Sequence, residues 1–154
     1  MKLSIYQLFI FFLILSCNQN KTSNIESRAT DQNLIEGSWK LVYAEIREND
    51  SVQIKELRNT EFIKIINQTH FAFFNQELGT GENFMAGGGT YEFDGINYTE
   101  TLDFFASPDY RKHIFKFQAE IKGDSLIQQG FEKIEKADLD RYILEKYVRI
   151  QKIK

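Results

Sequence analysis

The alternation of apolar and polar residues predicts β-strands along most of the chain from residue 34 onward. Aromatic and β-branched side chains gather in short runs, and turn-forming residues separate one run from the next. We therefore expect strands at residues 39–46, 61–66, 69–74, 90–93, 96–105, 113–121, 125–131 and 140–150.

Three short segments between these runs have the composition of tight turns. Asp94-Gly95 is a dipeptide that a type I′ turn prefers, because both central residues of that turn need a positive φ. Gly123-Asp124 indicates a second hairpin, and Asn67-Gln68 indicates a third. Consecutive hairpins close most simply into an up-and-down antiparallel barrel, which leaves no exposed sheet edge. The sequence thus predicts a mainly β fold, a single barrel of about eight strands, with short helical turns near residues 34–35 and 132–138.

The parity of each run predicts which side chains face the barrel interior, because successive residues of a strand point to opposite faces. The inward faces would then be Thr69, Phe71 and Phe73; Tyr98, Glu100, Leu102 and Phe104; and His113, Phe115, Phe117, Ala119 and Ile121. An apolar wall with a few polar groups is typical of a small-molecule pocket. The candidate pocket residues are Phe71, Phe73, Tyr98, Glu100, His113, Phe115 and Phe117. Alternatively, the same rings fill the barrel completely.

A buried Glu100 would need a partner, because an unpaired carboxylate in the interior is costly. Arg149 or a tyrosine hydroxyl could serve.

The first seventeen residues have the layout of a secretion signal. Lys2 supplies a positive charge, and the apolar stretch that follows is shorter than the roughly 20 residues that span a bilayer. The stretch ends in Ile14-Leu15-Ser16-Cys17, which resembles the bacterial lipobox. That resemblance implies cleavage before Cys17, acylation of this cysteine and anchoring to a membrane, because two or more acyl chains hold a protein stably.

Three segments therefore make up the expected organisation. Residues 1–17 are the lipoprotein signal ending at the acylated Cys17, and residues 18–33 are a flexible polar tether with too few apolar residues to fold alone. Residues 34–154 form the barrel domain. The expected location is the cell envelope, and the residues after Cys17 leave the membrane and the leaflet open.

Charge and residue usage narrow the classes of function. The chain has 19 Lys and Arg residues against 22 Asp and Glu residues, a net charge of −3, with both signs interspersed. Nucleic-acid binding needs clustered basic residues, so we expect no nucleic-acid partner. Cys17 is the only cysteine, which excludes a disulfide, a cysteine nucleophile and a cysteine–zinc site from the barrel domain. With only His70 and His113 as histidines and no distinctive carboxylate pair, we expect no enzyme, no metal site and no cofactor.

Gly37-Ser38-Trp39 resembles the G-x-W signature of the lipocalin and wider calycin group. Segments 87–91 and 98–100 are similar to a bacterial lipocalin-like family of uncharacterised membrane or secreted proteins. The resemblance implies that Gly37, Trp39 and Arg149 form a structural plug, with Arg149 packed across the indole at the closed end of the barrel. It also implies an envelope protein that binds a small apolar or lipid-like ligand. The alternative is a non-enzymatic interaction or structural module with a filled barrel, acting through an exposed apolar patch near residues 79–85 or 106–110.

Overall fold

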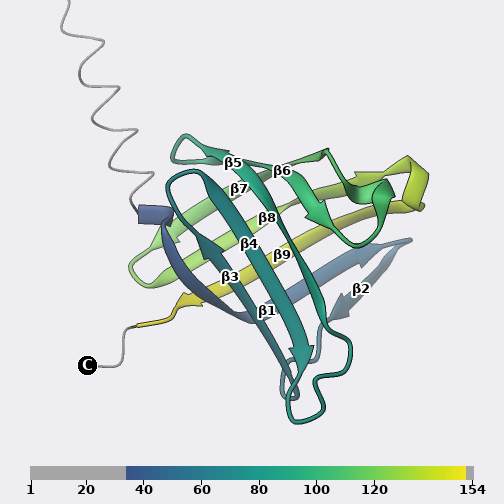
Figure 1. The fold of residues 1–154 in the computed structure, drawn as a ribbon, viewed down its shortest axis with the longest axis horizontal. Helices are drawn as coiled ribbons and strands as arrows, with labels where there is room; N and C mark the ends of the chain where they lie inside the picture. Colours follow the sequence, from purple (N-terminus) through teal and green to yellow (C-terminus); the bar gives the residue numbers. More distant parts are fainter. Residues whose placement is uncertain (1–33, 152–154) are drawn as a thin grey trace, which may run out of the picture.

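Antiparallel pairing between consecutive strands organises residues 34–151, the part of the chain that the computed structural model describes (Figure 1). The strands are β1 (Gly37–Glu48), β2 (Ser51–Ile54), β3 (Thr60–Ile66), β4 (His70–Glu77), β5 (Met85–Phe93), β6 (Asn97–Phe105), β7 (His113–Lys122), β8 (Ser125–Ile134) and β9 (Leu139–Arg149). Two single-turn 3-10 helices, η1 (Pro108–Tyr110) and η2 (Glu135–Ala137), lie in the β6–β7 and β8–β9 connections respectively. The signal, Cys17 and the tether lie outside the described residues.

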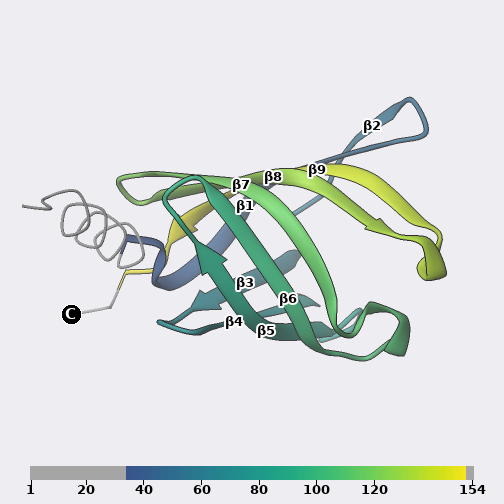
Figure 2. The ribbon, with the colours of Figure 1, turned by 90° about the horizontal axis from the view of Figure 1, so that it is seen from above.

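The barrel closes where β1 pairs with β9, from Trp39 opposite Arg149 to Arg47 opposite Tyr142. Strands β1 and β3–β9 therefore form a closed eight-stranded antiparallel up-and-down barrel, and the predicted fold class is confirmed. Figure 2 shows β7, β8 and β9 on one side of this barrel and β3, β4 and β5 on the other. No helix within residues 34–151 combines the length and apolar character that crossing a membrane requires.

Strand β2 was not predicted from the sequence. It has four residues, all of them exposed, so no alternation between a buried and a solvent face marks it. It pairs with the second half of β1, beyond the four residues that β1 shares with β3.

Two of the predicted turns form hairpins with different geometries. Gly123-Asp124 is a two-residue loop in which Gly123 has a φ of 58°, as the first central residue of a type II′ turn requires. The β5–β6 loop instead contains three residues, and only Gly95 has a positive φ, at 101°. The type I′ prediction is therefore wrong. The Asp94 carboxylate accepts hydrogen bonds from the backbone N–H groups of Ile96 at 3.1 Å and Asn97 at 2.8 Å, which closes a longer loop.

A β-bulge in β6 reverses the expected parity at the end of that strand. Gly89 pairs with Leu102 but Gly88 pairs with Phe104, so Asp103 is the additional residue. Phe104 consequently points outward and is 69% exposed, whereas Phe105 packs against the core. The inward position predicted for Phe104 is wrong. A Cβ atom on Gly89 would overlap the carbonyl oxygen of Thr101, so the bulge requires glycine at this position.

The hydrophobic core lies inside the barrel and is contributed by every barrel strand. Because the closed hydrogen-bond ladder and this core are both contained in residues 35–149, the chain from Asp31 onward includes a complete folding unit.

Candidate functional site

The closed end of the barrel is packed around Trp39, which is fully buried. Its indole Nε1 donates a hydrogen bond of 2.8 Å to the carbonyl oxygen of Ile35, and the Arg149 guanidinium lies 4.1 Å from the ring centroid. Arg149 also donates to the carbonyl oxygens of Glu36 at 2.5 Å and Leu34 at 2.6 Å, which fastens the chain preceding β1 across this end. A cation over an indole face adds electrostatic attraction to the area that the ring buries.

Gly37 belongs to the same arrangement for two physical reasons. Its φ is 147°, which L side chains rarely adopt, and a Cβ atom there would overlap the Arg149 guanidinium. Gly37, Trp39 and Arg149 thus lie together, as the G-x-W resemblance implies.

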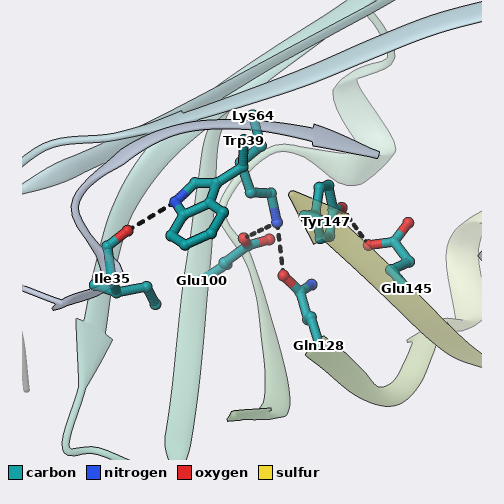
Figure 3. Close-up of polar contacts among 7 residues, drawn as sticks. All are labelled: Ile35, Trp39, Lys64, Glu100, Gln128, Glu145 and Tyr147. Atoms are coloured by element: carbon teal, nitrogen blue, oxygen red, sulfur yellow. Dashed lines mark hydrogen bonds and ion pairs between the residues drawn. The ribbon is translucent and has the colours of Figure 1, made fainter. Parts of the chain in front are cut away.

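A layer of polar side chains crosses the interior next to Trp39 (Figure 3). Lys64 on β3 is 3% exposed, and its Nζ donates hydrogen bonds of 2.7 Å to Glu100 Oε1 on β6 and 2.7 Å to Gln128 Oε1 on β8. The ammonium also lies 5.5–5.7 Å from the ring centroids of Phe71, Tyr98 and Tyr147. The ion-pair partner of Glu100 is therefore Lys64. The predicted pairing of Glu100 with Arg149 is wrong, because Arg149 is committed to the closed end.

A second carboxylate belongs to the same layer. The Tyr147 hydroxyl donates a 2.5 Å hydrogen bond to Glu145 Oε2, and Glu145 lies opposite Gln128 in the β8–β9 pairing. Burial raises the pKa of Glu145, and Lys64 and the Tyr147 hydrogen bond offset this only in part. Burial and the neighbouring Glu145 carboxylate raise the pKa of Tyr147. We call Lys64, Glu100, Gln128, Glu145 and Tyr147 the polar layer.

Tyr98 lies beside this layer, fully buried. Its hydroxyl has no hydrogen-bond partner among the described residues, and burial together with the charge of Glu100 raises its pKa.

On the side of the polar layer away from Trp39, the barrel contains a cavity of about 560 Å³. This lies within the roughly 300–1,000 Å³ of ordinary ligand pockets. The polar layer is its floor, and most of its wall is apolar, contributed by Ala44, Ile46, Phe62, Phe73, Leu102, Phe105, Phe115 and Ile143. Phe62 and Phe73 stack with ring centroids 5.6 Å apart. The barrel is packed at its closed end and hollow above the polar layer.

Charged side chains also border the cavity away from its floor. Glu132 accepts a hydrogen bond of 2.6 Å from Arg141 Nε, so these two charges form an ion pair. Lys55 donates to Asn75 Oδ1 at 3.3 Å and lies 5.4 Å from the Phe62 ring centroid. Burial lowers the pKa of Lys55, while the negative charge of Glu145 raises it in part.

Of the residues predicted to line a pocket, Phe73, Glu100 and Phe115 do so. Phe71, Tyr98 and Phe117 are buried in the core but do not line the cavity. His113 lies at the start of β7 and borders a separate surface depression with Lys112 and Ile134, so the structure does not bring it to the cavity.

Sequence reasoning missed Lys64, Gln128 and Glu145. Each has the same parity as buried neighbours on its strand: Phe62 and Ile66, Leu126, and Ile143 and Tyr147. A polar residue at an inward position of an apolar run was the signal that could have found them.

No three His, Cys, Asp or Glu side chains within residues 34–151 converge as a metal site would require. No protein-family model matches the chain, and a search of curated proteins finds no sequence that matches it. The fold and the cavity are therefore the basis for a function.

Proposed function

We propose that this chain is a lipoprotein of the bacterial cell envelope whose barrel binds a small, largely apolar molecule. The cavity of about 560 Å³ beside the polar layer carries this proposal, because a mostly apolar wall interrupted by polar groups suits such a ligand. The anchor is supported by the sequence around Cys17, and the barrel would then act at a membrane surface.

The binding experiment uses protein that begins at Asp31. Native mass spectrometry of this protein, purified from its own host, should show a co-purified small molecule, and the neutral dye phenylnaphthylamine should gain fluorescence on binding. Absence of both signals would overturn the proposal.

A variant of Ala44 makes the test specific to the cavity. Ala44 is 3% exposed and lines the cavity wall, so Ala44→Phe should fill part of the space and weaken dye binding. Val42→Phe is the matched control, because Val42 is 48% exposed and lies outside the lining. Equal dye binding by both variants would place the bound dye elsewhere.

The anchor has a separate test in the full chain. Expressed in a bacterium fed an alkyne analogue of palmitate, the wild-type chain should become labelled, and Cys17→Ser should not. An unlabelled wild-type chain would contradict the lipoprotein assignment while leaving ligand binding unaffected.

The interaction module remains the second candidate, because Phe84 is 64% and Leu78 is 49% exposed around the β4–β5 loop. Under that candidate, Phe84→Ser would abolish association with an envelope partner, and Ala44→Phe would leave it unchanged.

A further inference from the structure

The charges of the polar layer are not balanced. Lys64 is the one cation in the layer, and both Glu100 and Glu145 are carboxylates. Lys64 is already committed, since its Nζ donates to Glu100 and to Gln128, each at 2.7 Å. A ligand that reaches the floor of the cavity therefore meets more negative than positive charge.

Glu145 is the unbalanced group. It accepts a hydrogen bond from the Tyr147 hydroxyl at Oε2, and among residues 34–151 no cation lies within ion-pair distance of it. Its side chain lines the cavity. Two other cations border the cavity. Arg141 is paired with Glu132, whereas Lys55 donates a hydrogen bond to the neutral Asn75 amide and its charge acts on Glu145 from beyond ion-pair distance. Within the described part of the chain, the Glu145 carboxylate thus borders the cavity without a cation at ion-pair distance.

From this geometry we infer that the buried end of the ligand is a protonated amine, which pairs with Glu145 while its apolar tail lies against the phenylalanine wall. The inference rests on the proposed function and specifies its ligand class as a cationic amphiphile. Such an amine would leave the floor neutral, with two carboxylates facing two cations. A carboxylate head group would instead add a third negative charge to a poorly solvated site.

The raised pKa of Glu145 agrees with this arrangement, because burial is its first cause and the charge of Lys64 and the Tyr147 hydrogen bond offset it only in part. A bound ammonium would add a counter-charge. The apolar tail would lie against Phe73, Leu102 and Phe115 of the lining.

The test is displacement of phenylnaphthylamine from the protein beginning at Asp31 by three molecules with the same tail: dodecylamine, dodecanol and dodecanoate, each below its micelle concentration at neutral pH. We expect the amine to bind at least about tenfold more tightly than the carboxylate, with the alcohol between them, as one buried charge-assisted hydrogen bond would give.

Glu145→Gln should reduce the preference for the amine over the alcohol to less than about threefold, because the amide keeps the shape but loses the charge. Glu120→Gln is the matched control, since Glu120 lies on the outer face of β7 beside Lys122 and its loss changes the net charge equally. The control should retain the wild-type preference.

Two results would overturn the inference: dodecanoate binding as tightly as dodecylamine to the wild type, or an unchanged amine preference in a folded Glu145→Gln variant. The head-group comparison in the wild type decides the question even if that variant does not fold. If the dye binds but the amine has no advantage, only this inference fails. If neither the dye nor any of the three molecules binds, the proposed function fails with it.

Discussion

Removing the buried cation of the polar layer is the sharpest test of how this barrel is stabilised. In Lys64→Met, Glu100 keeps its buried position with a side chain that is 8% exposed, but it loses the ammonium 2.7 Å away. Gln128 loses a 2.7 Å hydrogen bond in the same change. Breaking a buried ion pair from one side costs about 3–5 kcal/mol, because the remaining charge stays unsolvated.

The free energy of unfolding of Lys64→Met, measured by urea denaturation at pH 7 with the protein beginning at Asp31, should therefore fall by about 3–5 kcal/mol. For a barrel of this size, the midpoint of thermal unfolding should decrease by roughly 10–20 °C.

The double variant Lys64→Met/Glu100→Met provides the control. Replacing a buried ion pair by apolar side chains of similar volume is often neutral or stabilising, so the double variant should recover most of the loss. A cost below about 1 kcal/mol for Lys64→Met would refute the reasoning. Additive costs of the two single changes would refute it as well, because residues in direct contact should show a coupling energy.

Three further expectations concern the closed end and the cavity floor. Trp39→Ala should lower the free energy of unfolding by about 3–5 kcal/mol, and a loss below 1 kcal/mol would contradict a plug at this position. Gly37→Ala should lower the thermal midpoint more than Gly79→Ala, because both glycines have a positive φ but only the new Cβ at Gly37 meets another atom, in Arg149; equal midpoints would show that overlap is unimportant. The pKa of Glu145 is raised in the folded state, so the folded protein binds its proton more tightly than the unfolded chain and loses stability as the pH rises above the ordinary pKa of 4.5. Urea denaturation from pH 4 to pH 8 should therefore show Glu145→Gln gaining stability relative to the wild type, and a constant difference would exclude this linkage.

Strands whose two faces differ in polarity could be predicted from the sequence. The eight barrel strands alternate between a buried and a solvent face, and local turn residues such as Gly123-Asp124 fix which strands become neighbours. Strand β2 and the outward position of Phe104 could not be predicted in this way. The first has no buried face, and the second depends on a bulge that is set by the pairing of β5 with β6.

By itself the sequence determined the fold class, the succession of strands and three of the residues that line the cavity, because side-chain alternation is a local property of each strand. The tertiary structure alone decided the partner of Glu100 and the hollow half of the barrel. Glu100 and Gln128 follow Lys64 by 36 and 64 residues in the sequence and lie on two other strands. Only closure of the barrel brings the three side chains together. Glu145 is a polar residue in a strand by sequence, and it becomes a candidate ligand-binding group only because the closed barrel buries it beside a cavity.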